Sequence, residues 1–266
     1  MEKTDMLIEY ETLKFNQVTK DFEIVKDVVA IEDLISLYIN GSLHTVFHCL
    51  PSRIEELIVG YLLTSGIIEC KRDIIEMKIS GRNIYIKLSE KVRFNASERF
   101  TFIATLYEGE IPPPYMLEVA RKLRSNKMKI SSENVFKAVE ILNSRSPIFR
   151  ASGGTHAAVL IDKDEIIAFA EDIGRHNAVD KVIGEAVMKD IDFGRLILAS
   201  TGRLSSEIVI KAIRMGIPVL VSLSAPTSMG VRLAKAFGLT LIGFVRGGRF
   251  NIYSSPDRIE EWDGNR

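Results

Sequence analysis

The stretch Glu171-Asp172-Ile173-Gly174-Arg175-His176-Asn177-Ala178-Val179-Asp180-Lys181 joins an apolar run to a helical pattern. It gathers carboxylates, a glycine, an arginine, a histidine and an asparagine where a strand is expected to lead into a helix. Unpaired N–H groups and a partial positive charge make such a helix N-terminus a natural site for phosphate or another anion. The alternative is a polar cap and a surface turn, in which Asp172 or Asn177 only satisfies the backbone.

Composition narrows the class of protein. The 266 residues contain 35 Lys plus Arg and 35 Asp plus Glu, so no net charge draws the chain to nucleic acid or a membrane surface. The two cysteines, Cys49 and Cys70, cannot form a disulfide scaffold and fit a reducing compartment. No window approaches the roughly 18 apolar residues of a membrane span, and residues 1–23 lack the apolar core of a secretion signal. We expect a cytoplasmic protein.

Hydrophobic periodicity predicts two units. The first half combines short strands, including hairpins around Asn40-Gly41 and residues 80–82, with a strong helix that opens at Pro51 and closes at Gly66. The second half has the order α-β-β-α-β-α-β-α-β, typical of a parallel-rich sheet covered on both faces. We predict an α/β protein, α+β overall, with a smaller N-terminal α+β domain over residues 1–112 and a C-terminal three-layer domain over residues 113–266. The expected strands are 34–39, 43–47, 74–79, 83–88, 156–161, 166–170, 196–199, 219–222, 240–245 and 250–253, and the expected helices are 51–66, 115–123, 134–142, 177–188, 205–215 and 227–237.

Polar loops follow successive strands of the predicted second sheet. Residues 172–177, 200–203 and 222–228 each lie between a strand and a helix, and ligands of open α/β sheets bind outside the carboxyl ends of the strands. Residues 200–203 pair hydroxyls with a glycine and an arginine, as a phosphate-binding loop does. Residues 244–249 add two arginines, which suit both phosphate and the acceptor atoms of guanine. Convergence of these loops predicts a phosphorylated or nucleotide-like ligand.

Each loop also has a purely structural explanation. Ser205, Ser206 or Thr227 could cap the helix that follows it. Residues 244–249 could form a turn with solvated arginines, and His156 could be an ordinary hydrogen-bonded strand residue.

The order α-β-β-α-β-α-β resembles that of the nucleobase deaminase fold, whose zinc signature is H-x-E followed by P-C-x-x-C. The corresponding helix starts carry His176-Asn177-Ala178 and residues 200–206, so the glutamate and both cysteine ligands are missing. We therefore expect no zinc and no other metal held by protein ligands. Two alternatives stay open: a nucleotide-dependent enzyme with His176 as general base and Asp172 as its orienter, and a structural module that binds no nucleotide.

Long, order-preserving motifs resemble the formate dehydrogenase accessory protein family, FdhD. They are Gly153-Gly154-Thr155-His156-Ala157-Ala158, residues 171–181, Ser224-Ala225-Pro226-Thr227-Ser228, residues 243–253, and Thr64-Ser65-Gly66-Ile67-Ile68. The resemblance covers roughly residues 33–68 and 152–253. It implies a cytoplasmic sulfurtransferase with a cytidine-deaminase-like C-terminal domain. Such a protein takes sulfur from a cysteine desulfurase and passes it to the molybdenum (or tungsten) bis-molybdopterin guanine dinucleotide cofactor, before the cofactor enters formate dehydrogenase.

The resemblance also implies a homodimer and a cofactor site. Residues 244–249 would contact the guanine end of the cofactor, and the loops at 172–177 and 200–203 would line the remainder. The candidate cofactor-binding residues are Phe244, Val245, Arg246, Gly247, Gly248, Arg249, Asp172, Gly174, Arg175, His176, Asn177, Ser200, Thr201, Gly202, Arg203 and His156.

One family feature is absent from the sequence. The family carries the persulfide on a C-x-x-C loop before the helix that follows the first domain, whereas residues 102–112 here contain no cysteine. Sulfur relay requires a thiolate. Cys49, which precedes a helix start, is the remaining candidate for the sulfur carrier, ahead of Cys70. The alternative is that Cys49 is a buried, unreactive apolar residue. The catalytic residue is thus unknown and the sequence leaves open whether the chain is an enzyme; the sharper hypothesis is a cofactor chaperone or sensor that binds the cofactor without carrying sulfur.

Overall fold

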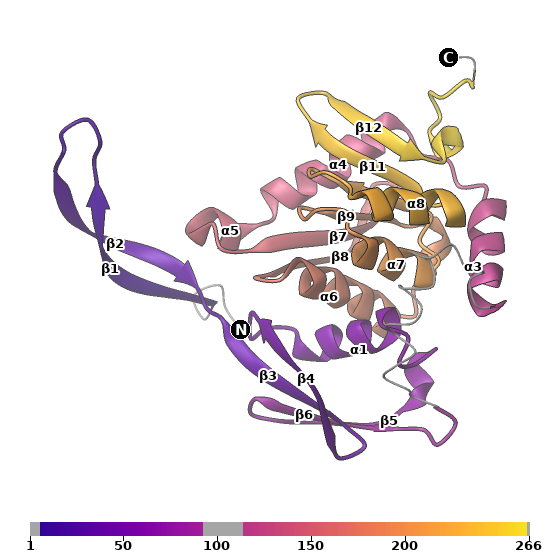
Figure 1. Cartoon of the computed structure of the whole chain (residues 1–266), viewed down its shortest axis with the longest axis horizontal. Coiled ribbons are helices and arrows are strands. Elements are labelled where there is room, and N and C mark those ends of the chain that lie inside the picture. Colours follow the sequence, from indigo (N-terminus) through magenta and orange to yellow (C-terminus); the bar gives the residue numbers. More distant parts are fainter. Residues whose placement is uncertain (1–5, 93–113, 265–266) are drawn as a thin grey trace.

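The computed structural model describes residues 6–92 and 114–264, which form three sheets and the helices that cover them (Figure 1). A two-stranded sheet pairs β1 (Leu7–Phe15) with β2 (Phe22–Ala30), and a four-stranded sheet has the order β4 (Ser42–Cys49), β3 (Asp33–Ile39), β6 (Asn83–Leu88), β5 (Ile74–Ser80). A six-stranded sheet has the order β12 (Arg249–Ser254), β11 (Thr240–Arg246), β10 (Val219–Ser222), β9 (Ile197–Ser200), β7 (His156–Asp162), β8 (Glu165–Asp172). The α-helices are α1 (Ile54–Thr64), α3 (Pro114–Ser125), α4 (Ser132–Ser144), α5 (Pro147–Ser152), α6 (Arg175–Met188), α7 (Ser206–Arg214) and α8 (Ser228–Phe237).

The four-stranded sheet packs one face on α1. Alternate residues of β3, such as Ile35 and Leu37, are buried against this helix, as the period of two of a half-buried strand requires. Asn40 and Gly41 have φ values of 49° and 85°, which confirms the tight turn expected between β3 and β4. The predicted helix start at Pro51 is wrong: α1 begins at Ile54, because Arg53 adopts a left-handed conformation with φ 56°.

The six-stranded sheet is buried on both faces. Strands β9, β10 and β11 are parallel to one another. Strand β7 runs antiparallel to both of its neighbours, β8 and β9, and β12 runs antiparallel to β11. Leu160 and Leu198 belong to the core formed with α6, α7 and α8, while Val159 and Ala199 pack with α4 on the opposite face. This confirms the predicted order of strands and helices and the cover on both faces.

The two larger units meet where α1 crosses α6 (Figure 1). A Cβ atom added to Gly60 would lie 1.9 Å from the carbonyl oxygen of Asp180, and one added to Gly184 would lie 1.9 Å from that of Glu56. The two helix backbones are therefore in direct contact, which only glycine permits at these points. The predicted domain boundary at residue 112 falls outside the described residues and stays a prediction.

Two elements are missing from the sequence-based expectation: α5 and the β1–β2 hairpin. The hairpin projects from the body of the molecule, beyond the end of α5 (Figure 1). We call residues 7–30 the arm. No helix within the described ranges combines the length and the apolar character needed to cross a membrane.

Candidate functional site

The polar loops gather at one edge of the six-stranded sheet. His156, the first residue of β7, lies opposite Asp172, the last residue of β8. Ala158 of β7 lies opposite Ser200, the last residue of β9. Ser200 in turn lies opposite Ser222, the last residue of β10. The convergence expected for the loops at 172–177, 200–203 and 222–228 is confirmed.

Side-chain hydrogen bonds tie the loop at 200–203 to its neighbours. Thr201 Oγ1 lies 3.1 Å from His156 Nδ1 and accepts the backbone N–H of Ala157 at 3.1 Å. Ser222 Oγ donates to the carbonyl of Gly202 at 2.7 Å. Because both flanking strands hold it, this loop is fixed before any ligand binds. Arg203 is exposed at its rim.

Arg175 lies across this loop. A Cβ atom added to Gly202 would be 2.8 Å from both Cβ and Cδ of Arg175, so only glycine leaves room for the arginine there. Arg175 Nε is buried and has no hydrogen-bond partner among the described residues. A buried donor without an acceptor costs about 1–3 kcal/mol, and an anionic ligand at this place would relieve that cost.

Beside these loops is a cavity of about 510 Å³, whose walls include Thr155, His156, Ile173, Thr201 and Leu223. Burial lowers the pKa of His156, and the nearby charges of Arg175 and His176 lower it further, although Asp172 acts in the opposite direction. The imidazole in this wall is therefore neutral at pH 7 and can both donate and accept a hydrogen bond.

The turn between β11 and β12 forms the far end of the same edge. Phe244 has φ 55°, a left-handed conformation that is uncommon for a bulky residue, and its N–H donates to the carbonyl of Ser224 at 3.1 Å. Val245 is fully buried, whereas Arg246 and Arg249 are exposed on either side of Gly247 and Gly248. The guanidinium of Arg246 lies 5.4 Å from the Phe244 ring centroid. The turn thus exposes two arginines to solvent, while the hydrogen bond of Phe244 and the burial of Val245 fix the backbone next to them.

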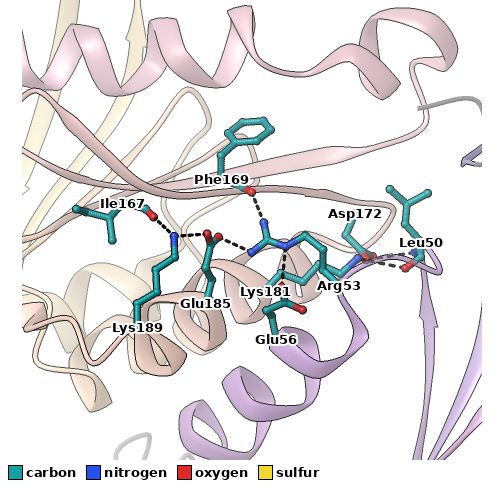
Figure 2. Close-up of polar contacts among 9 residues, drawn as sticks. All are labelled: Leu50, Arg53, Glu56, Ile167, Phe169, Asp172, Lys181, Glu185 and Lys189. Carbon is teal, nitrogen blue, oxygen red and sulfur yellow. Dashed lines mark hydrogen bonds and ion pairs between the residues drawn. The ribbon is translucent and has the colours of Figure 1, made fainter. Parts of the chain in front are cut away.

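Asp172 and Asn177 are held by the protein itself. Asp172 is fully buried; its Oδ2 lies 2.6 Å from Lys181 Nζ and accepts the N–H of Leu50 at 3.2 Å (Figure 2). Its Oδ1 accepts the N–H of Gly174 at 2.9 Å and the amide of Asn177 at 3.0 Å. This geometry matches the alternative in which Asp172 and Asn177 serve the backbone and bind no ligand. The two side chains shape the loop at 172–177 and attach it to the segment that precedes α1.

His176 does not pair with Asp172. Its Nε2 lies 2.9 Å from the carboxylate of Glu207 on α7, while both oxygens of Asp172 have the partners given above. The general-base pair of the enzyme alternative is therefore not assembled in this structure.

Several polar residues hold different helices and strands together through contacts that the sequence analysis did not predict. Glu171 accepts the N–H groups of Ile148 and Phe149 at 3.1 Å and 2.7 Å and so caps α5. Asp180 lies 2.7 Å from Lys211 Nζ and accepts the hydroxyl of Thr64 at 2.7 Å. Glu171, Asp180 and Thr64 all stand in the quoted motifs, but their partners are distant in sequence.

The cysteines differ in environment. Cys49 is fully buried, and burial, assisted by the carboxylate of Asp172, raises the pKa of its thiol to about 12. Cys70 is exposed. Residues 102–112, where the family resemblance leads us to expect the sulfur-carrying loop, lie outside the described residues. Within the part of the chain that is described, no group of three or more His, Cys, Asp or Glu side chains could hold a metal ion.

The fold and this edge define a mixed α/β protein with several sheets and a polar site at strand ends. A model of the FdhD/NarQ family matches residues 30–260. The sulfur carrier protein FdhD of Wolinella succinogenes is 36% identical over 239 residues, which cover 88% of this chain and 83% of that protein. The protein of the same name from Sulfolobus acidocaldarius is 36% identical over 238 residues, or 88% and 92% of the two chains. A crystal structure of a candidate formate dehydrogenase accessory protein from Desulfotalea psychrophila superposes with a TM-score of 0.77 at 25% identity, covering 96% of this chain and 99% of that one. The chain belongs to the FdhD/NarQ family.

Proposed function

We propose that this protein is an accessory factor for formate dehydrogenase that binds the bis-molybdopterin guanine dinucleotide form of the molybdenum (or tungsten) cofactor. Its C-terminal domain would be a cytidine-deaminase-like fold without zinc. Membership of the FdhD/NarQ family and relatives named sulfur carrier protein FdhD support this proposal. The single observation that carries the site is the buried Nε of Arg175, which has no hydrogen-bond partner among the described residues and lies next to Gly202, at the edge where the loops meet.

The residues present fit such a cofactor. Arg175, Arg203, Arg246 and Arg249 supply guanidinium groups for phosphates, and the loop at 200–203 supplies hydroxyl and backbone groups. The turn at 244–249, whose Arg246 and Arg249 are exposed, would hold the guanine end. When bound, the cofactor would supply the metal centre that receives sulfur; this chain would bind and orient it and keep one face of it from water.

The residues of this chain give little support for sulfur transfer, the activity that the family resemblance implies. A thiol with a pKa of about 12 is almost wholly protonated at neutral pH, so Cys49 is a poor persulfide carrier. We therefore propose a cofactor chaperone, with a cysteine desulfurase and formate dehydrogenase as partners in the same maturation. Incubation with a desulfurase and cysteine, followed by mass spectrometry, tests this: a stable persulfide on either cysteine would establish a carrier.

Titration with GDP in a calorimeter tests the binding site. We expect binding, and we expect Arg175→Ala and Arg249→Ala each to weaken it roughly tenfold or more, because a lost charge-assisted hydrogen bond costs about 1.5–3 kcal/mol. Arg72→Ala, in the 3-10 turn η2 (Lys71–Asp73) that follows α1, is the matched control and should leave the affinity unchanged. Absence of GDP binding to the unmodified protein would refute the proposal.

A further inference from the structure

A second cavity, of about 140 Å³, lies between α1, α6 and α7 (Figure 1). Among the described residues, its walls share no member with the cavity of about 510 Å³ beside the loop at 200–203. His176 and Asn177, which the family resemblance assigned to the cofactor, line this second cavity. A cavity of about 150 Å³ can hold benzene, so a ligand of about six to eight non-hydrogen atoms fits. We call it the three-helix cavity.

The most deeply buried part of its lining is an ion pair. Lys211 Nζ lies 2.7 Å from each carboxylate oxygen of Asp180, and the two side chains are only 8% and 2% exposed. Lys211 also donates to Thr64 Oγ1 at 2.8 Å, which uses all three donors of its ammonium group. A buried ion pair is often no more stable than apolar side chains of the same volume. Packing alone therefore does not require charged groups at this place.

One face of α7 lines the cavity along the whole length of the helix. Glu207, Ile210, Lys211 and Arg214 all contribute to the wall, and their spacing of i, i+3, i+4 and i+7 places them on one side of a helix. Glu207 stands in the first turn and Arg214 is the last residue. At about 1.5 Å per residue, their Cα atoms are roughly 10 Å apart along the helix axis. This face thus carries an anion at one end and a cation at the other.

Both end groups have capacity for a ligand. One oxygen of Glu207 lies 2.9 Å from His176 Nε2, and the Glu207 side chain is 55% exposed. A Cβ atom added to Gly66 would overlap the guanidinium of Arg214, so this group lies against the backbone at the end of α1. A carboxylate has about four acceptor sites and a guanidinium has five N–H donors. Each can therefore bond a ligand in addition to the protein.

Between the two ends the wall is apolar. The rings of Phe47 on β4 and Tyr61 on α1 meet edge to face, with centroids 4.9 Å apart, and Ile210 lies on the α7 side. The hydroxyl of Tyr61 lies 3.0 Å from His44 Nε2, which holds the ring in place. Such a surface suits a short hydrocarbon part of a ligand and offers nothing to a third charge.

We propose that the three-helix cavity binds a small zwitterionic amino acid, whose ammonium group contacts Glu207 and whose carboxylate contacts Arg214. The two charged groups of an α-amino acid are about 3 Å apart. With about 2.8 Å for each charge-assisted bond, the contacts span about 8–9 Å, close to the separation of the two ends of α7. A simple anion would face the carboxylates of Glu207 and Asp180, and a simple cation would face Lys211 and Arg214. A molecule that carries both charges avoids both repulsions.

Calorimetric titration of the full chain tests this proposal. L-serine should bind with a Kd on the order of 1 mM or lower, the range usual for so few atoms. Acetate and ethylammonium, which each carry one of the two charges, should bind at least about tenfold more weakly. This comparison uses the unmodified protein alone and does not depend on how variants fold. Absence of serine binding, or binding of either half-molecule as tight as that of serine, would overturn the proposal.

Variants at the two ends of α7 test the contacts. Glu207→Gln and Arg214→Met should each weaken serine binding roughly tenfold or more. Arg214→Lys should weaken it less, because it keeps the charge but loses the paired donors of the guanidinium. Arg232→Met, at an exposed arginine of α8, is the matched control and should bind serine as the unmodified protein does. Serine binding that is unchanged in both Glu207→Gln and Arg214→Met would overturn the proposal.

The cofactor site is tested separately by titration with GDP. Binding of GDP without binding of serine would refute the amino-acid site alone. Binding of serine without binding of GDP would support the amino-acid site and refute the proposed cofactor site.

Discussion

Lys181 Nζ lies 2.6 Å from Asp172 Oδ2, and neither side chain is exposed to solvent. Lys181 also donates to the carbonyl of Leu50 at 3.2 Å, while Asp172 accepts the N–H of the same residue. One buried ion pair therefore satisfies both polar groups of a residue that lies before α1 (Figure 2). The two side chains stand in the polar segment 171–181, yet they hold the N-terminal unit against the sheet edge and do not face a ligand.

Breaking this pair should destabilise the protein strongly. Asp172→Asn leaves the Lys181 ammonium buried without a counter-charge, and such a change costs about 3–5 kcal/mol. Urea denaturation should show that loss, and the double variant Asp172→Asn with Lys181→Met should lose less than the sum of the two single variants. The exposed pair Lys137–Asp164 is the control, because Lys137→Met should cost less than about 1 kcal/mol. Equal losses at the buried and exposed pairs would contradict this explanation.

The Asp172 segment also shows how far sequence reasoning reaches. The hydrophobic periodicity of the sequence identified the strands and helices around this segment. The rule that loops after parallel strands meet at one edge of the sheet correctly placed residues 172–177 beside residues 200–203. The partners of the individual polar groups could not be predicted, because Leu50 is 122 residues from Asp172 along the chain. A capping carboxylate and a ligand-binding carboxylate look identical in sequence; only burial and contacts distinguish them.

The arm escaped prediction for a related reason. Its strands carry apolar residues on both faces and many charges, so neither the alternation of a half-buried strand nor the run of a buried one is present. Helix α5 is six residues long and is stabilised by the distant Glu171, so local periodicity does not indicate it.

Gly60→Ala and Gly184→Ala should each loosen the crossing of α1 and α6. The added methyl group would overlap a carbonyl oxygen of the facing helix, at 1.9 Å in both cases, so the helices must separate. Over-packing of this kind costs about 1–3 kcal/mol, measurable as a lower midpoint of urea unfolding. Gly194→Ala, where the nearest atom would be an ordinary 3.4 Å away, is the control. If all three variants unfold at the same midpoint, the helices are not in backbone contact.

Cys49 and Cys70 should differ sharply in reactivity. With a pKa of about 12, the Cys49 thiolate is roughly one part in 10,000 at pH 8, and the side chain is buried. Ellman's reagent should therefore label one thiol quickly in the folded protein and two in 6 M guanidinium, and Cys70→Ser should remove the fast reaction. A fast reaction that survives Cys70→Ser would show that Cys49 is accessible and would reopen its role as a sulfur carrier.

His156 should make the protein less stable at mildly acidic pH. Burial, followed by the charges of Arg175 and His176, lowers the pKa of its imidazole in the folded state. Below the ordinary pKa of about 6.5, the unfolded chain therefore binds a proton that the folded chain resists, so the free energy of unfolding falls as the pH drops. Above that pH the effect vanishes, because the imidazole is neutral in both states. In urea denaturation, His156→Gln should lose less stability than the unmodified protein between pH 7 and pH 5. His48→Gln, at an exposed imidazole paired with Glu32, is the control and should not reduce the acid-induced loss. An acid-induced loss that is the same in His156→Gln and in the unmodified protein would show that this histidine is not held neutral by its surroundings.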